Sequence, residues 1–403
     1  MKNTLSFFLA ALFFGFIYTV QAGGVLKNKK EIMHPVITNN NGIIISMPVS
    51  RIVYQRDNKN KAIIQIRGEI DDNATSIEAR LVARKKGEGT NTKWKNIATS
   101  ISPGDFSGLF TGEAGWYNLE VRAKKGKKIT ATTVIERVGI GEVFVVAGHS
   151  VAQGGEINIE GASDDRVNTV SLHEKSAVFQ KYLETGDPQY LPDPVFVQAA
   201  TGIAQAPFGH DNYFWSKFGE LLAQKENVPV LIYNAAFGGT NLEHWAKAAK
   251  GIQFEHGFVK SKIRMPYINL LNTFKKYIPL TGLRAILADH GQNDAGEKDA
   301  KIILKNYKIF IKQAREDLNY PELALVVNRQ TPKDAPAVRI AQEKMILESY
   351  CFPGPDYDKL LPEDHVDGIH LNESGEEKAA VMWADALTQK FFKTSLPWLP
   401  SWK

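Results

Sequence analysis

Between Ile43 and Ile135 the chain alternates apolar and polar positions in short stretches, with the period of two that is typical of half-buried strands. Turn-forming segments such as Asp57-Asn58-Lys59-Asn60 separate the stretches, and no helical period survives across them. This pattern predicts antiparallel strands in a small, immunoglobulin-like β-sandwich. The expected strands are 42–47, 62–70, 76–85, 115–124 and 129–138.

After Val138 the pattern changes to continuous apolar runs that alternate with amphipathic stretches of helical length. Such runs suit strands buried on both faces, and their alternation with helices predicts a doubly wound α/β fold with a parallel, flavodoxin-like sheet. The expected strands are 143–148, 229–236, 284–289 and 323–328. Helices are expected around 214–222 and 302–314, and a third from about Ser374 to Phe392.

The first residues predict export. An apolar stretch from Leu5 to Val20 is followed by small residues up to Ala22, which is typical of a signal peptide over residues 1–22. An uncleaved membrane anchor is the alternative, because the stretch is near the lower length limit of a spanning helix. We therefore expect a secreted or periplasmic protein, with a β-sandwich domain over 23–138 and an α/β domain over 139–403.

Charge and cysteine content narrow the possible partners. The 403 residues carry 49 basic and 44 acidic side chains, spread along the chain without a basic stripe, so nucleic-acid binding is not expected. No membrane interaction beyond export is expected either. The single cysteine, Cys351, allows no intrachain disulfide. The oligomeric state stays open.

Candidate chemistry follows the apolar runs, because ligands of such sheets bind outside the carboxyl ends of the strands. The first run ends in Gly148-His149-Ser150, which places a serine hydroxyl where the chain leaves the sheet. The second run is followed by Gly238-Gly239, a pair whose backbone N–H groups could closely approach a developing oxyanion. Taken singly, the serine could be an ordinary loop hydroxyl and the glycines a tight turn.

Two later segments supply the remaining groups of a nucleophilic site. Gly291-Gln292-Asn293-Asp294 follows the third run, where Asn293 could offer an amide donor, although the segment could also be a β-turn. Asp367 and His370 stand three residues apart before the last expected helix, so the carboxylate could orient the imidazole, unless both merely cap that helix. Taken together, the four segments predict Ser150 as nucleophile, His370 as base, Asp367 as its partner, and Gly239 and Asn293 as oxyanion donors.

The four segments resemble the SGNH hydrolases, whose blocks carry serine, glycine, asparagine and histidine in this order. Here these are Ser150, Gly239, Asn293 and His370, and the most specific signals are the G-x-N-D and D-x-x-H patterns. Within that superfamily, GEVFVVAGHS and the segment 214–245 are similar to the sialate O-acetylesterase and acetylxylan esterase relatives. Those relatives usually carry glutamine where this chain has His149, and commonly a glutamate-containing third block.

The resemblance implies a carbohydrate O-acetylesterase that acts on an acetylated oligosaccharide or polysaccharide and needs no metal or cofactor. His149, Trp245 and His290 flank the motifs and are candidate substrate contacts, although Trp245 is equally compatible with core packing. Three alternatives stay open. They are a lipase or thioesterase of the same superfamily, a glycan-binding protein on a hydrolase scaffold, and a zinc site that uses Asp364, His365, Asp367 and His370, with His149 and His290 nearby.

Overall fold

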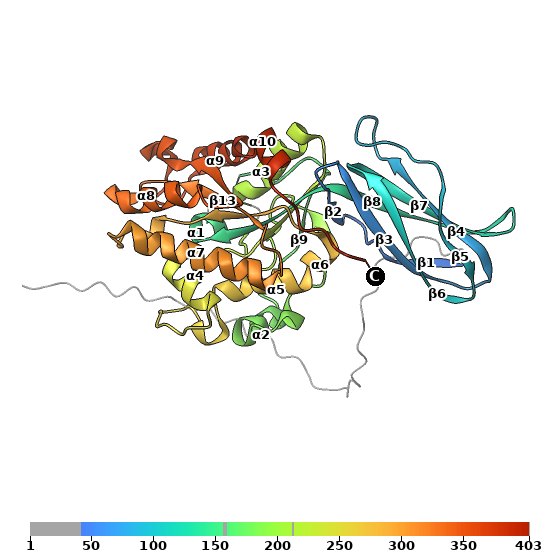
Figure 1. The fold of residues 1–403 in the computed structure, drawn as a ribbon, viewed down its shortest axis with the longest axis horizontal. Helices are drawn as coiled ribbons and strands as arrows, with labels where there is room; N and C mark the ends of the chain where they lie inside the picture. The colour runs from blue at the N-terminus through green and yellow to red at the C-terminus, as the bar shows by residue number, and fades with distance from the viewer. Residues whose placement is uncertain (1–41, 156–158, 212, 403) are drawn as a thin grey trace, which may run out of the picture. The chain divides into compact units, whose positions relative to one another are not determined.

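The N-terminal strands form two sheets in the structure, a computed structural model that describes residues 42–155, 159–211 and 213–402 (Figure 1). One is antiparallel, with the order β1 (Ile43–Met47), β3 (Lys61–Ile70), β6 (Gly104–Glu113). In the other, β5 (Lys95–Ile101), β4 (Ala74–Ala83), β7 (Gly115–Lys125) and β8 (Lys128–Gly148) pair antiparallel, and β2 (Val53–Gln55) pairs parallel with β8. The predicted signal peptide lies outside the described residues.

The two N-terminal sheets share one apolar core. Alternate residues of β3, β6 and β7 are buried, as the period of two requires, while their neighbours in sequence are more exposed. Side chains from both sheets, such as Ile64, Phe110 and Leu119, belong to the same cluster. The predicted antiparallel sandwich is therefore present. The sequence pattern missed β2, β5 and β6.

The α/β part is built on a sheet with the order β10, β9, β11, β8, β12, β13, β14, parallel throughout except for the pair β10–β9. This confirms the predicted α/β fold. The strands β11 and β12 lie on opposite sides of β8, and the chain forms β11 before it crosses to β12. The connections on the two sides therefore diverge at the carboxyl end of β8. The bounds are Val167–Val170 for β9, Phe196–Gln198 for β10, Val230–Asn234 for β11, Ala285–Asp289 for β12, Ala324–Arg329 for β13 and Cys351–Asp356 for β14.

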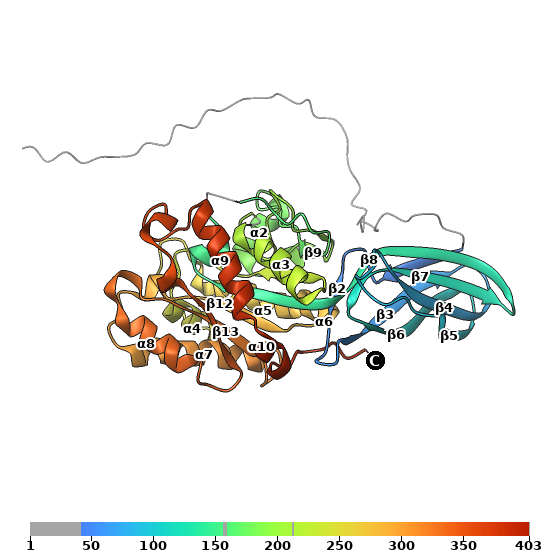
Figure 2. The ribbon, with the colours of Figure 1, turned by 90° about the horizontal axis from the view of Figure 1, so that it is seen from above.

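Helices cover both faces of this sheet (Figure 2). On one face α3 (Tyr213–Glu226) packs against α9 (Glu373–Ala386), and their core includes Phe144 and Val146 of β8. The intervening Val143 and Val145 belong to the core of the opposite face. That face is covered by α4 (Leu242–Ala249), α5 (Tyr267–Lys276), α7 (Ala300–Asp317) and α8 (Pro336–Met345). The remaining α-helices of the described ranges are α1 (Ser150–Gln153), α2 (Ala177–Thr185), α6 (Ile278–Thr281) and α10 (Gln389–Thr394).

The last expected helix is broken, which corrects the prediction of one helix from Ser374 to Phe392. The chain leaves helical geometry at Leu387, and the Thr388 side chain accepts a hydrogen bond from the Phe391 N–H at 3.3 Å, which starts α10. Within the described ranges, no helix has the length and apolar character needed to cross a membrane.

The 21-residue strand β8 belongs to both parts of the molecule, since it pairs with β7 over its first half and with β11 and β12 over its second. Near its middle lies Glu142, which is fully buried. The Glu142 carboxylate accepts hydrogen bonds from Arg284 Nε at 2.8 Å and from Arg56 Nε at 2.6 Å, and these two guanidinium groups outweigh burial and hold its pKa below the ordinary value. Arg56 follows β2, so this ion cluster joins the N-terminal strands to the parallel sheet.

Candidate active site

Ser150 lies directly beyond the carboxyl end of β8, as the first residue of α1. His149 caps this turn, and its Nδ1 accepts a hydrogen bond from the Val151 N–H at 3.2 Å. Gly148 allows the close approach of β8 to β12, because a side chain at this position would collide with the Asp289 carbonyl. The sharp exit from the strand therefore presents the Ser150 hydroxyl at the edge of the sheet.

The predicted triad residues lie within hydrogen-bonding distance of one another. His370 Nε2 is 2.8 Å from Ser150 Oγ, and His370 Nδ1 is 2.8 Å from Asp367 Oδ2. Both contacts are satisfied when Nδ1 carries the imidazole proton, which it donates to the carboxylate while Nε2 accepts from the serine hydroxyl. Two segments far apart in sequence thus bring together a serine hydroxyl, an imidazole and a carboxylate in the geometry of a Ser-His-Asp triad.

A short loop fixes the acidic member of this set. The second Asp367 oxygen, Oδ1, accepts hydrogen bonds from the backbone N–H groups of Ile369 at 2.9 Å and His370 at 2.8 Å. Gly368, with φ +80, makes the required left-handed turn between them. The hydrogen bonds from the His370 backbone, the His370 side chain and the Ile369 backbone lower the pKa of the Asp367 carboxyl well below its usual range. Asp367 is therefore ionised at neutral pH.

The glycine pair lies beside the nucleophile. A β-carbon at Gly238 would lie 3.4 Å from Ser150 Cβ, so this backbone packs directly against the serine. Gly239 has φ +70, which glycine adopts without strain. The Gly238 N–H donates to Gln153 Oε1 at 2.6 Å, while Gln153 Nε2 donates to the Phe208 carbonyl at 3.0 Å. The role of Gly239 as an oxyanion donor stays a prediction.

Gln153 is a site residue that the sequence reasoning missed. It is 5% exposed and links the nucleophile turn to the glycine pair through its amide. Its position three residues after Ser150, within one helical turn, was the signal that could have found it, because residues at this spacing share a helix face.

The third block is tied to the second by a hydrogen bond between loops. Asn293 Nδ2 donates to the Thr240 carbonyl at 2.9 Å, and Asp294 Oδ1 accepts from the Leu242 N–H at 3.0 Å. One of the two amide hydrogens of Asn293 is thereby used, and one remains for another acceptor. Burial raises the pKa of Asp294 to about 7. The structure thus brings Asn293 next to the glycine loop, while its role as an oxyanion donor stays a prediction.

The three predicted substrate contacts are all buried. Trp245 is 0% exposed, and its Nε1 donates to Thr240 Oγ1 at 2.9 Å. His290 is 0% exposed and packs edge to face with Trp245, with ring centroids 5.3 Å apart, and His149 is 1% exposed. The expectation that these side chains contact a sugar is corrected, because none of them has a surface that a sugar ring could reach.

His149 and His290 instead form a buried layer beneath the triad. Burial, with a smaller contribution from the charge of His370, lowers the pKa of His149 to about 3. Burial also lowers the pKa of His290 well below its ordinary value. Both imidazoles are therefore neutral at pH 7. Among the described residues, the imidazole that contacts Ser150 Oγ is that of His370.

The residues of the zinc alternative are engaged in other contacts. Asp364 is buried, and its carboxylate accepts hydrogen bonds from Lys378 Nζ at 2.6 and 2.9 Å. His365 Nδ1 lies 2.9 Å from the Leu361 carbonyl. Over residues 42–155, 159–211 and 213–402, no three His, Cys, Asp or Glu side chains are grouped closely enough to hold a metal ion.

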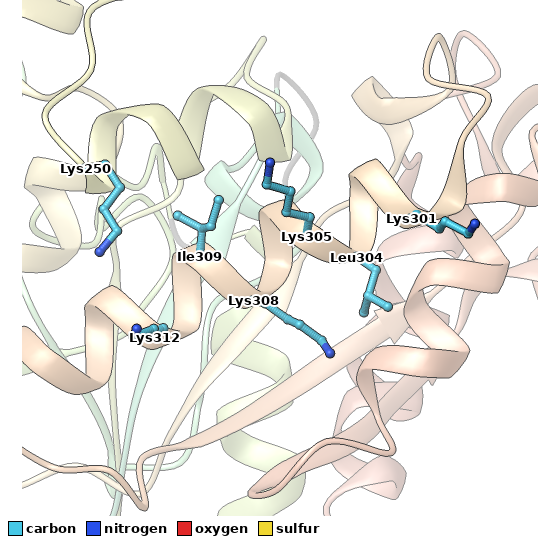
Figure 3. A pocket seen from close by; sticks show the side chains of 7 residues that line it. All are labelled: Lys250, Lys301, Leu304, Lys305, Lys308, Ile309 and Lys312. Carbon is cyan, nitrogen blue, oxygen red and sulfur yellow. The ribbon is translucent and has the colours of Figure 1, made fainter.

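A surface groove of about 440 Å³ on α7 is separate from this site (Figure 3). It is lined by Lys250, Lys301, Leu304, Lys305, Lys308, Ile309 and Lys312. Three of its ammonium groups have polar partners, since Lys308 pairs with Glu348 at 2.8 Å, Lys250 donates to Gln313 at 2.7 Å and Lys312 pairs with Glu316 at 3.8 Å. None of the predicted site residues lines the groove. The groove is therefore a charged helix face.

Several solved structures of carbohydrate esterases are similar to the chain. A carbohydrate acetylesterase from Xanthomonas citri shares 16% identity over 85% of this chain and 74% of that chain, with a TM-score of 0.50. An acetyl xylan esterase from the rumen bacterium Butyrivibrio proteoclasticus shares 11% identity over 88% and 97% of the two chains, with a TM-score of 0.35. A family two carbohydrate esterase from Clostridium thermocellum shares 13% identity over 87% and 99%, also with a TM-score of 0.35. At this identity, the likeness to the Xanthomonas protein supports the fold alone.

A sequence model of a protein family matches more than half of the chain. No curated protein matches the chain. Residues 141–389, which hold all four predicted blocks, match the model described as carbohydrate esterase, sialic acid-specific acetylesterase. The resemblance inferred from the motifs is thereby confirmed, and the chain belongs to this family of carbohydrate esterases.

Proposed function

We propose that the protein is a serine esterase that removes acetyl groups from carbohydrates through an acyl-enzyme intermediate. The observation that carries the proposal is the continuous chain of contacts from Ser150 Oγ to His370 Nε2, and from His370 Nδ1 to Asp367 Oδ2, each 2.8 Å long. Family membership supports the substrate class, since carbohydrate esterases act on acylated sugars.

The first half of the reaction forms the acyl-enzyme. His370 Nε2 accepts the hydroxyl proton as Ser150 Oγ attacks the ester carbonyl carbon. Asp367 stabilises the imidazolium that results, because its ionised carboxylate already accepts a hydrogen bond from the Nδ1–H group. The tetrahedral intermediate then collapses, His370 returns the proton to the departing sugar oxygen, and the acetyl group stays on Ser150.

The second half releases acetate. A water molecule gives a proton to His370 Nε2 and attacks the acyl carbon. The second tetrahedral intermediate then collapses to acetic acid as His370 returns that proton to the departing Ser150 Oγ, which regenerates the free serine. In both halves a negative charge develops on the carbonyl oxygen. We propose that the Ser150 and Gly239 N–H groups and the Asn293 amide donate to it, a role supported by the position of the glycine pair beside Ser150.

The proposal is tested by acetate release from wild-type protein and Ser150→Ala. 4-Nitrophenyl acetate reports the chemistry, and a panel of O-acetylated sialic acid, xylan and glucomannan oligosaccharides reports the substrate. We expect Ser150→Ala to retain about a thousandth of the rate or less, because it removes the attacking atom. Equal rates for the two proteins would exclude the triad mechanism.

The same panel separates the alternatives. A 4-nitrophenyl palmitate or acyl-thioester substrate that is hydrolysed faster than every acetylated sugar would indicate a lipase or thioesterase. Sugar binding without hydrolysis of any ester would indicate a glycan-binding protein on an esterase scaffold.

A further inference from the structure

An exposed aromatic ring lies beside the candidate active site. Phe258 is 63% exposed, while every other Phe, Tyr and Trp side chain within the described ranges is buried or half-buried. A single exposed apolar side chain needs no explanation by itself, so the position of this ring matters more than its exposure. Beside a candidate reactive site, an exposed aromatic ring offers a flat apolar face that a ligand can contact.

The ring is placed by the same loop that flanks the nucleophile. A β-carbon at Gly239 would lie 2.5 Å from Phe258 Cζ, so the ring packs on the second glycine of the pair. The first glycine, Gly238, packs on Ser150, as described above. Adding the backbone step between the two glycines puts the ring at most about 13 Å from Ser150 Cβ, a span that one or two sugar rings would cover.

Neighbouring rings hold Phe258 in this orientation. It is stacked on Phe237, with ring centroids 6.2 Å apart and an interplanar angle of 14°, and Phe237 is stacked in turn on Phe208 at 4.6 Å and 18°. His256 contacts Phe258 perpendicularly at 4.6 Å, and its Nε2 lies 3.2 Å from the Gly239 carbonyl. The exposed ring therefore stands on a preformed stack rather than on a free loop tip.

The chemistry of the ring selects its ligand. The face of an aromatic ring carries partial negative charge and is apolar, which suits the C–H groups on one face of a pyranose and offers nothing to an anion. A neutral sugar ring in a glycan chain therefore fits this surface best.

We propose that Phe258 is a binding platform on which a pyranose ring of the acetylated glycan stacks while its ester group reaches Ser150. This inference deepens the proposed function and rests on it. Phe258 would then set the preference for glycan esters over small esters, a discrimination that the buried Trp245 cannot supply.

The test compares Phe258→Ala and Phe258→Tyr with Ile252→Ala. Ile252 is 54% exposed in the same segment, which makes it a matched loss of apolar surface. The two substrates are 4-nitrophenyl acetate and the acetylated oligosaccharide of the panel that wild type hydrolyses fastest. For Phe258→Ala we expect kcat/KM on the oligosaccharide to fall about tenfold, mainly through KM, from the apolar contact that is lost. The kcat/KM of Phe258→Ala on the small ester should stay within about twofold of the wild-type value. The kcat/KM of Phe258→Tyr and of Ile252→Ala should do the same on both substrates.

Two outcomes would overturn the platform. An equal loss on both substrates would mean that the ring only supports the Gly239 loop, and no loss on either would mean that no sugar contacts it. A binding titration with the deacetylated panel oligosaccharides separates this inference from the proposed function. If no ester is hydrolysed but Phe258→Ala weakens sugar binding about tenfold, the platform stands and the esterase proposal fails. Absence of sugar binding and of hydrolysis overturns both.

Discussion

Replacing Asp367 by asparagine would remove the charge next to His370 and leave the size of the side chain unchanged. The carboxylate accepts hydrogen bonds from the Nδ1–H group of His370 and from two backbone N–H groups, with donor–acceptor distances of 2.8 to 2.9 Å. An asparagine has one acceptor oxygen, so the backbone contacts and the imidazole contact can no longer all be satisfied. If the oxygen stays on the backbone, the amide N–H₂ faces Nδ1 and favours the tautomer with the proton on Nε2, which cannot accept the Ser150 proton.

The expected loss follows from two contributions. A charge pair about 4 Å apart near a protein surface is worth about 4 kcal/mol, and the 52% exposure of the Asp367 side chain reduces this to roughly 2 kcal/mol by solvent screening. The lost charge-assisted hydrogen bond to the imidazole adds about 2 kcal/mol. A total near 4 kcal/mol corresponds to about a thousandfold lower kcat.

The assay is steady-state hydrolysis of 4-nitrophenyl acetate, with a thermal unfolding curve on the same sample. Because Asp367 lies half in solvent, its hydrogen bonds are partly screened, and we expect the free energy of unfolding to fall by about 1 kcal/mol or less. Asp385→Asn on α9, where the aspartate is exposed, serves as control and should leave kcat unchanged. A kcat within tenfold of wild type for Asp367→Asn would show that another group orients His370, and the triad assignment would be wrong.

Two further predictions concern stability. Glu142→Gln leaves the buried Arg284 guanidinium without a counter-charge and Arg56 with Glu226 as its remaining carboxylate, so urea unfolding should show a loss of about 3–5 kcal/mol. The surface control Glu120→Gln should lose less than about 1 kcal/mol, and similar losses for both would show that the cluster is not a buried ion network. Burial raises the pKa of Asp289 to about 7, which is above its value in the unfolded chain. The contribution of the neutral carboxyl to stability is therefore complete below about pH 4 and is lost as the pH rises to about 7. Asp289→Asn should therefore gain stability relative to wild type between pH 5 and pH 8 in urea titrations, and a constant difference would contradict the raised pKa.

The sequence predicted the fold and the triad for different reasons. Apolar runs and the residues at their ends are local signals, and they located β8, β11, β12 and β13 and the residues that follow them. Strands with weak local patterns were missed, among them β9 and β14, because their burial is decided by neighbours distant in the chain. Ser150, His370 and Asp367 could be predicted only together, from the order of their motifs, since each motif alone had a simpler explanation, and their catalytic roles stay a prediction.

The surroundings of the site were harder to predict, because burial is a tertiary property. Trp245 is an aromatic residue beside a motif, and nothing in its local sequence distinguishes a sugar contact from the buried position it occupies. Conversely, Phe258 lies in a segment without periodicity, and its exposure follows from the packing of its ring on Gly239 and Phe237. The spacing of three residues from Ser150 could have predicted that Gln153 lies at the site, whereas nothing in the sequence predicts its hydrogen bond with Gly238.

The shared strand β8 has a consequence for how this protein can be shortened or recombined. A catalytic part cut free at residue 139 would begin inside a paired strand, losing β2 as the partner of Gly139–Gly141 and Gln55 as the acceptor for the Val143 N–H. It would also leave Arg284 facing Glu142 without Arg56. The N-terminal strands are thus not a detachable accessory in the physical sense. They pair with the strand that leads to Ser150, and any chimera that keeps Ser150 in place should keep them as well.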